Sequence, residues 1–177
     1  MNVSPKAVAM IKHHEGVRQK PYRCPAKLWT VGVGHVLYPE QGKLPIDKRD
    51  GFALKIEDFR TFEMDEIDGI LRADLARFER GVHTYITAPL TQGMFDGLVS
   101  FSFNVGLGTL QRSTLRQKLN RGDKEGAGQE LLKYCMAGGK ILKGLQNRRL
   151  DEHALSSWLE AFSLGELWEK NLLGGRP

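Results

Sequence analysis

The 177-residue sequence has only two cysteines, Cys24 and Cys135, and no long apolar run. Two cysteines cannot build a disulfide framework, and neither lies in a CxxC or Cys/His pattern typical of a structural zinc site. Every apolar run is short and interrupted by charge, so we expect no membrane-spanning segment. The net charge is +5, yet no basic run resembles a nucleic-acid-binding arm. These absences argue against a disulfide-rich scaffold, an integral membrane protein and a protein with a basic nucleic-acid arm.

The first fourteen residues carry Lys6 and Lys12 but no continuous apolar stretch, so we expect neither a signal peptide nor a signal anchor. Both cysteines are then expected to be reduced thiols in a cytosol. The composition is that of an ordinary globular protein, with 41% hydrophobic and 27% charged residues. The length is enough for one domain or two packed lobes with a buried core. The basic balance favours an anionic partner such as nucleic acid, lipid or cell wall; evenly spread solubilising charge is the alternative.

The N-terminal part of the chain is predicted to combine one short helix with strands. Ser4 before Pro5 predicts a helix start, and Glu15 with the glycine after it predicts the helix end. Residues 23–38 alternate large and small side chains and predict strands and turns. Residues 39–60 are rich in turn-forming residues and predict a loop with one short helix.

The rest of the chain is predicted to be helical. An acidic start, an apolar stripe and Gly81 as a stop predict a connecting helix over residues 63–81. Residues 91–104 are apolar nearly all round, which is typical of a central helix. Gly138-Gly139 predicts a break before a final helix over 145–162. The predicted fold class is α+β and mainly helical, in a single domain. Its parts are a small N-terminal lobe with a short antiparallel sheet (1–62), the connecting helix (63–81), a helical lobe (82–162) and a tail (163–177).

The most informative string contains Glu15, Cys24 and Thr30, separated by eight and then five residues. The carboxylic acid ends a predicted helix, and the thiol and hydroxyl follow on a predicted turn and strand. That arrangement can place a proton donor and a water-holding pair on two walls of one cleft, which suits cleavage of a glycosidic bond. Two structural alternatives stay open: a solvated surface carboxylate for Glu15 and a small buried hydrophobe for Cys24.

This string, continued as Thr30-Val31-Gly32-Val33-Gly34-His35, resembles the active-site segment of phage-type lysozymes, glycoside hydrolase family 24. The resemblance covers about residues 4–162 and continues, in the family's order, through the segments 90–92, 101–106, 113–115, 119–123, 137–139 and 144–149. It implies a lysozyme-like fold and a muramidase. Such an enzyme hydrolyses the β-1,4 bond between N-acetylmuramic acid and N-acetylglucosamine, without a metal or cofactor.

By this resemblance Glu15 is the general acid, and Cys24 and Thr30 position the attacking water. Cys24 stands where aspartate is commoner, so its role as base, electrostatic partner or nucleophile stays open. Water positioning with inversion at the sugar is the preferred hypothesis. A thiol performs this task well only as a thiolate, and we expect nearby cations to lower its pKa. These cations are Arg18, Lys20, Arg23 and Lys27.

Other residues match supporting positions of the family. Arg148 would pair with the catalytic acid, although a surface arginine on the last helix is the alternative reading. Asn104 and Gln92 lie in family motifs and are expected to bind substrate or support the site. His35 and Asp74 match a structural ion pair.

The resemblance also implies peptidoglycan glycan strands as the substrate. We expect a monomer with no nucleic-acid partner and no stable membrane insertion. Made in the host cytoplasm without an anchor, the enzyme would need a membrane-permeabilising partner, a holin, to reach the periplasm and cell wall. Two alternatives stay open: a lytic transglycosylase that forms 1,6-anhydro ends, and a non-catalytic cell-wall binding protein. The paired thiol and hydroxyl favour hydrolysis, because a transglycosylase needs no water-holding partner.

Overall fold

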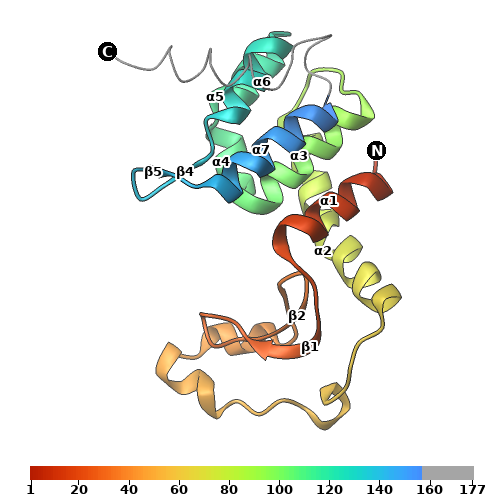
Figure 1. The fold of residues 1–177 in the computed structure, drawn as a ribbon, viewed down its shortest axis with the longest axis vertical. Helices are drawn as coiled ribbons and strands as arrows, with labels where there is room; N and C mark the ends of the chain where they lie inside the picture. The colour runs from red at the N-terminus through yellow and green to blue at the C-terminus, as the bar shows by residue number, and fades with distance from the viewer. Residues whose placement is uncertain (157–177) are drawn as a thin grey trace. The chain divides into compact units, whose positions relative to one another are not determined.

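The structure, a computed structural model, describes residues 1–156 (Figure 1). The chain divides into two compact units: one comprises residues 11–74, and the other combines residues 1–10 with the chain from Leu75 onward. The first unit contains a three-stranded sheet, and the part of the second unit within residues 1–156 is helical apart from one short hairpin. The predicted α+β, mainly helical fold class is confirmed. In residues 1–156 no helix is both long and apolar enough to cross a bilayer.

Helix α1 (Pro5–Glu15) begins and ends where the sequence predicts. The Ala7 backbone N–H donates to Ser4 Oγ at 3.2 Å, which caps the first turn. At the other end Gly16 has a φ of +75°, and its N–H donates to the Lys12 carbonyl at 3.0 Å. This left-handed conformation costs glycine little and other residues much more, so the helix ends one residue before it.

Three antiparallel strands in the order β1-β2-β3 form the sheet of the first unit. They are β1 (Arg18–Arg23), β2 (Trp29–Gly32) and β3 (His35–Val36). Where the sequence predicted one short helix in residues 39–60, the structure has three 3-10 helices. These are η1 (Pro39–Lys43), η2 (Ile46–Gly51) and η3 (Ile56–Asp58). In the core, Gly32 has a φ of +63°, and a Cβ there would lie 3.2 Å from Ile67 Cγ2, so the strand packs closely on the helix that carries Ile67.

That helix is α2 (Met64–Tyr85), which runs four residues past the predicted end. Gly81 was predicted to stop it, and this prediction is wrong: Gly81 is buried inside the helix. A Cβ at Gly81 would lie 2.2 Å from Leu107 Cδ2, so the missing side chain makes room for a neighbouring helix. The glycine therefore serves packing, which a single sequence does not distinguish from a helix stop.

The helical unit is built around α3 (Gln92–Val105), whose side chains are buried on nearly all sides, as predicted. The other elements follow in chain order (Figure 1). They are α4 (Leu107–Arg112), α5 (Thr114–Asn120), α6 (Lys124–Leu132), β4 (Met136–Ala137), β5 (Lys140–Ile141) and α7 (Lys143–Ser156). Helices α3 and α7 lie directly against each other: a Cβ at Gly93 would lie 2.1 Å from the Leu155 carbonyl oxygen.

The structure adds detail to three predicted segments. The first ten residues join the helical unit, because Val3 N–H donates to Glu79 Oε1 at 2.8 Å and Ser4 N–H to Asp96 Oδ1 at 3.0 Å. Gly138-Gly139 was predicted as a break before the final helix; the pair does lie between α6 and α7, where it forms the turn of the β4–β5 hairpin. The predicted final helix corresponds to α7; its end beyond residue 156 and the tail 163–177 lie outside the described residues.

Candidate active site

Glu15 is the last residue of α1, and its side chain is exposed. The glycine after it turns the chain directly into β1, so the acid stands at the junction of helix and sheet. The end of α1 from Ile11 onward and the strand β1 belong to the unit of residues 11–74, together with Cys24 and Thr30. The structure thus carries the three predicted catalytic residues on one unit.

Cys24 begins the tight turn that joins β1 to β2. Its N–H donates to the Leu28 carbonyl at 3.0 Å, and its carbonyl accepts from Lys27 N–H at 2.7 Å. Lys27 adopts a φ of +61°, an uncommon conformation for a residue other than glycine. Arg23 supports the turn through two contacts. Its Nη1 donates to the Lys27 carbonyl at 2.7 Å, and its guanidinium lies 4.2 Å from the centroid of the Trp29 ring. Cys24 is therefore presented on a well-supported turn.

The Cys24 thiol is half-buried, and its pKa is lowered. Burial acts to raise the pKa of this thiol, but hydrogen bonds with the Leu28 backbone and the Thr30 hydroxyl outweigh it, helped by the Ala26 backbone. The sequence predicted a lowered pKa from neighbouring cations, whereas the cause in the structure is this set of hydrogen bonds. Hydrogen bonds of this kind favour the charged form of the thiol, so Cys24 ionises more readily than an ordinary cysteine.

Thr30 is 2% exposed and lies on β2 opposite Tyr22. Its hydroxyl donates to the Leu28 carbonyl at 3.0 Å and also hydrogen-bonds Cys24. Burial and two polar neighbours fix the orientation of this side chain. The structure therefore brings Thr30 to Cys24 directly, as the spacing of the sequence suggested.

His35 and Asp74 are also in contact: Nδ1 of the imidazole lies 2.9 Å and 3.1 Å from the two carboxylate oxygens. The pair joins β3 to α2 and is about one third exposed. It lies on the strand that pairs with β2, where Val31 faces His35. This geometry ties the edge of the sheet to the long helix.

Arg148 lies on α7 and is 3% exposed. Within the helical unit its Nε donates to Glu152 Oε1 at 3.1 Å, and its Nη2 donates to the Ser100 carbonyl at 3.2 Å. The neighbouring Arg149 shares the same carboxylate and donates to Asn104 Oδ1 at 3.1 Å. The alternative of a surface arginine is therefore wrong for Arg148. Its pairing with the catalytic acid stays a prediction.

Glu152 is the residue of this group that the sequence reasoning missed. It is fully buried between two arginines, and it accepts from Ser100 Oγ at 2.7 Å. Burial raises the pKa of Glu152, while Arg149 and Arg148 act to lower it. The spacing Arg148-x3-Glu152 places both side chains on one face of a helix and was the available signal.

Gln92 stands at the start of α3 and bonds to the N-terminal segment. Its Nε2 donates to the Asn2 carbonyl at 2.9 Å and to Asp96 Oδ1 at 2.8 Å. The bond to Asn2 helps to hold the N-terminal segment against α3 within the helical unit. Its predicted role in substrate binding stays a prediction.

The first unit also contains a cavity of about 370 Å³. It is lined by Lys20, Pro21, Trp29, Leu54, Asp58, Phe59, Arg60 and Thr61, and by none of the three predicted catalytic residues. Successive side chains of a strand point to opposite faces, so Trp29 in the cavity and Thr30 at the Cys24 turn belong to different faces of β2. Among residues 1–156, no three His, Cys, Asp or Glu side chains gather in a way that could hold a metal ion.

Comparisons with known proteins agree on one family. A family model described as phage lysozyme matches residues 12–152, a range that includes all predicted site residues. An endolysin of Acyrthosiphon pisum secondary endosymbiont phage 1 is 38% identical over 159 residues, covering 88% of this chain and 97% of its own length. An endolysin of Bacillus phage B103 is 35% identical over 157 residues, and there the alignment covers 88% of this chain but only 54% of the relative. The chain thus spans about half the length of that relative.

Among solved structures, a variant of phage P22 lysozyme superposes with a TM-score of 0.72 at 28% identity. The match covers 88% of this chain and 98% of that one. The similarity therefore extends over both units of the chain and is not limited to one motif.

Proposed function

Because the chain belongs to the phage lysozyme family, we propose that it is an endolysin that hydrolyses the β-1,4 bond between N-acetylmuramic acid and N-acetylglucosamine in peptidoglycan. The observation that carries the proposal is the Cys24 turn. There, hydrogen bonds lower the pKa of a thiol and hold it beside Thr30. A thiol with a lowered pKa and a carboxylic acid on the same unit fit the pair of base and acid that an inverting glycosidase needs.

In this mechanism Glu15 is the general acid. Its proton passes to the glycosidic oxygen as the bond to the sugar breaks, and the leaving sugar departs as an alcohol. Positive charge develops on the ring of the remaining sugar in this step. Glu15 is exposed at the end of α1.

Cys24 acts on the second reactant, the water molecule that attacks the sugar. As a thiolate it accepts a hydrogen bond from the water, and it takes a proton as the oxygen bonds to the anomeric carbon. Thr30 keeps the sulfur in position through its hydroxyl. The products are two shorter glycans, a protonated Cys24 and an ionised Glu15. Proton exchange with solvent restores the starting state.

Arg148 has a supporting role in the same proposal. Its guanidinium is held by the carboxylate of Glu152 and the carbonyl of Ser100, so its position is fixed from within α7 and α3. The predicted pairing of Arg148 with the catalytic acid would stabilise the carboxylate that remains after proton transfer. Asn104 supports this group through Arg149.

The test is loss of turbidity of chloroform-treated Gram-negative cells, with Glu15→Gln compared with wild type. General acid catalysis contributes about two to four decades in rate, so we expect a loss of that size with an unchanged melting temperature. Glu125→Gln, an exposed glutamate in the first turn of α6, is the control and should keep full activity. Full activity of the Glu15 variant would remove this residue from the mechanism.

The products separate hydrolysis from the alternatives. Hydrolysis leaves free reducing ends, whereas a lytic transglycosylase leaves 1,6-anhydro ends, which mass spectrometry resolves by the missing water. Binding of the protein to sedimented peptidoglycan without any product would support a non-catalytic binding protein.

We also propose that the enzyme acts as a monomer and stays in the host cytoplasm until a separate holin permeabilises the membrane. Peptidoglycan lies outside that membrane, so an enzyme made in the cytoplasm has to cross it. Expression in a bacterial host with and without a holin tests this dependence. Lysis only with the holin is expected, and equal lysis without it would contradict the proposal.

A further inference from the structure

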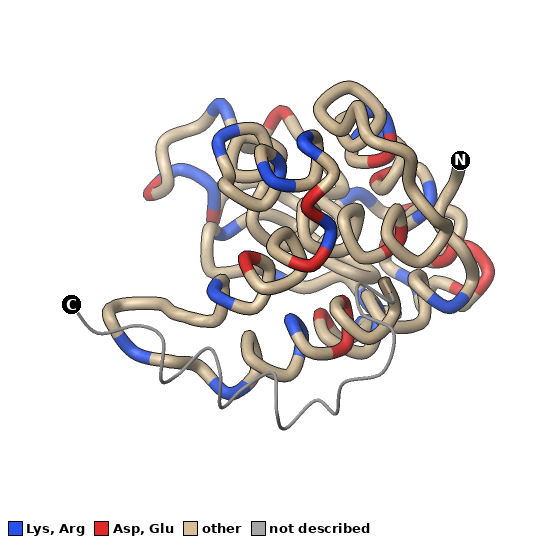
Figure 2. The backbone as a smooth tube through the Cα atoms, turned by 90° about the horizontal axis from the view of Figure 1, so that it is seen from above, with Lys and Arg blue, Asp and Glu red and all other residues tan. Residues whose placement is uncertain are grey.

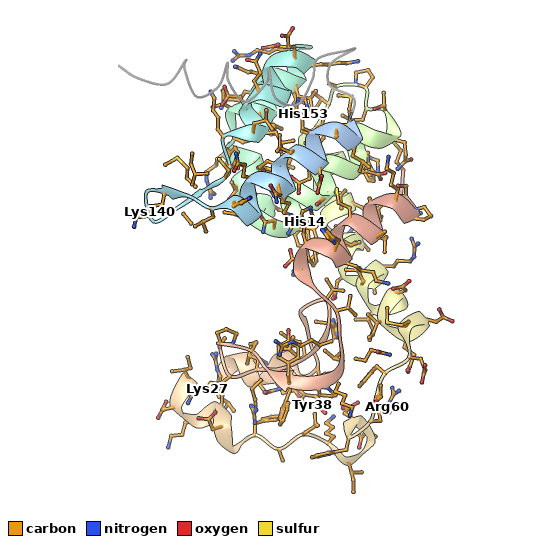
Figure 3. The ribbon with its side chains drawn as sticks, viewed as in Figure 1. His14, Lys27, Tyr38, Arg60, Lys140 and His153 are labelled. Carbon is orange, nitrogen blue, oxygen red and sulfur yellow. The ribbon has the colours of Figure 1, made fainter. Side chains whose placement is uncertain are left out.

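The β4–β5 hairpin is a short projection from the helical unit (Figures 1 and 3, with Lys140 labelled at its end). Gly138 and Gly139 have φ of +57° and +75°, the conformation that a two-residue hairpin turn requires. The base of the hairpin is anchored. Cys135 is 4% exposed, and its carbonyl accepts from Leu142 N–H at 2.9 Å. The projection therefore has a fixed base and an exposed end.

Large apolar side chains of the hairpin are exposed. Met136 is 57%, Ile141 is 47% and Leu142 is 45% exposed. Met136 and Ile141 are cross-strand partners, so their side chains lie on the same face of the hairpin. Three exposed apolar residues within seven positions form a group, and such groups mark interaction sites.

The surroundings of this group are strongly basic. In residues 112–143 eight Lys and Arg stand against three Asp and Glu, a net charge of +5. By contrast, residues 11–74 contain eleven basic and eleven acidic residues, a net charge of zero. Figure 2 colours these charges along the backbone. The excess positive charge of the chain thus lies on the unit that carries the hairpin.

Two of the three acidic residues in this segment are already engaged. The Asp123 side chain caps α6 and accepts from Gly126 N–H at 2.8 Å. Glu130 is bound by both Lys118 and Lys133, each at 2.9 Å. These two acids are therefore not directed to Lys140 and Lys143, the two lysines that flank Ile141 and Leu142.

We propose that the β4–β5 hairpin is a membrane-interface anchor that inserts Met136, Ile141 and Leu142 into an anionic lipid surface. Anionic headgroups complement the basic residues, and the hydrocarbon below them accepts the three apolar side chains. Peptidoglycan offers negative charge but no hydrocarbon layer, so it would leave the apolar group without a partner. This inference does not depend on the lytic mechanism.

Co-sedimentation of the full chain with vesicles tests the proposal. We expect binding to phosphatidylcholine vesicles that contain phosphatidylglycerol, and at least about tenfold weaker binding to phosphatidylcholine alone, because several lysines contribute at an anionic surface. The triple variant Met136→Ser, Ile141→Ser and Leu142→Ser should bind the anionic vesicles about tenfold more weakly, because its apolar contribution is lost. Lys140→Gln with Lys143→Gln should weaken binding to the anionic vesicles and make the remaining binding less sensitive to added salt, because fewer charges are left for salt to screen.

The matched control is the triple variant Ile46→Ser, Ile56→Ser and Phe59→Ser. These residues are 55%, 89% and 72% exposed, but they lie on the unit of zero net charge. The control should bind anionic vesicles like wild type, and both triple variants should keep wild-type activity on purified peptidoglycan.

Three outcomes would overturn the proposal: no vesicle binding by wild type, an equal loss in both triple variants, or a loss in the hairpin variant that appears with sedimented peptidoglycan instead of vesicles. Failure of lytic activity in the wild-type protein would overturn the proposed function and leave the vesicle result intact.

Discussion

The hydroxyl of Thr30 hydrogen-bonds both the Leu28 carbonyl, to which it donates at 3.0 Å, and the sulfur of Cys24. A hydroxyl has a single proton, so it cannot donate to both acceptors at the same moment. When Cys24 ionises, its sulfur becomes the stronger acceptor and competes for that proton. Ionisation of the thiol is therefore coupled to the orientation of Thr30.

Removal of the Thr30 hydroxyl should raise the pKa of Cys24. Thr30→Val keeps the branched shape and removes the donor, so alkylation of Cys24 by iodoacetamide should shift to higher pH. The measurement uses a Cys135→Ala background, although burial raises the pKa of Cys135 and slows its reaction. Thr87→Val, at an exposed threonine, is the control. An unchanged alkylation profile in Thr30→Val would mean that backbone hydrogen bonds alone hold the thiolate.

Cys24→Asp should retain activity and Cys24→Ser should lose about two decades of it, because a base contributes roughly that factor. Initial rates on purified peptidoglycan measure both. The reverse order would show that the nucleophilicity of sulfur matters.

The pH profile of activity should follow the ionisation of residue 24. Below the lowered pKa of Cys24 the thiol is protonated and cannot take a proton from water, so activity should fall as pH decreases through that pKa. In Cys24→Asp this acid limb should move to lower pH, because aspartate ionises near about 4. Identical acid limbs in the two proteins would contradict a role for Cys24 as base.

Gly93→Ala should destabilise the protein by about 1 to 3 kcal/mol, because overpacked contacts cost that much. The added Cβ would lie 2.1 Å from the Leu155 carbonyl oxygen, where backbone has to move. Gly69→Ala is the matched control: it lies in α2 with nothing within 4 Å of its Cβ position, and it should stabilise by about 0.5 to 1 kcal/mol. Urea unfolding measures both, and equal effects would show that α3 and α7 do not pack this closely.

Glu152→Gln should cost about 3 to 5 kcal/mol of stability, because it removes the buried carboxylate that both arginines bond. The exposed Glu125→Gln should change stability very little. Thermal unfolding distinguishes them. A melting temperature for Glu152→Gln that matches wild type would show that the arginines do not depend on this carboxylate.

Local features of the fold were predictable from residues close in sequence. The Ser4-Pro5 start and the glycine at position 16 fix the ends of α1, because caps act over one turn. The apolar run of 91–104 predicted the buried helix α3. The structural roles of Gly81 and Gly138 could not be inferred from residues close in sequence. A glycine serves equally as a helix stop, a packing gap or a hairpin turn, and only its neighbours in space select one.

The sequence by itself determined which chemical groups are present at residues 15, 24 and 30, because the covalent structure of the chain sets their types and their spacing. It also determined the class of the fold, through periodic apolar faces that must be buried. Only the tertiary structure decided why Cys24 is acidic. Its sulfur is stabilised by oriented hydrogen bonds from Leu28 and Thr30, and not by the cations nearby in sequence. The physical reason is that a hydrogen bond acts over about 3 Å and depends on direction, which the order of residues along a chain does not specify.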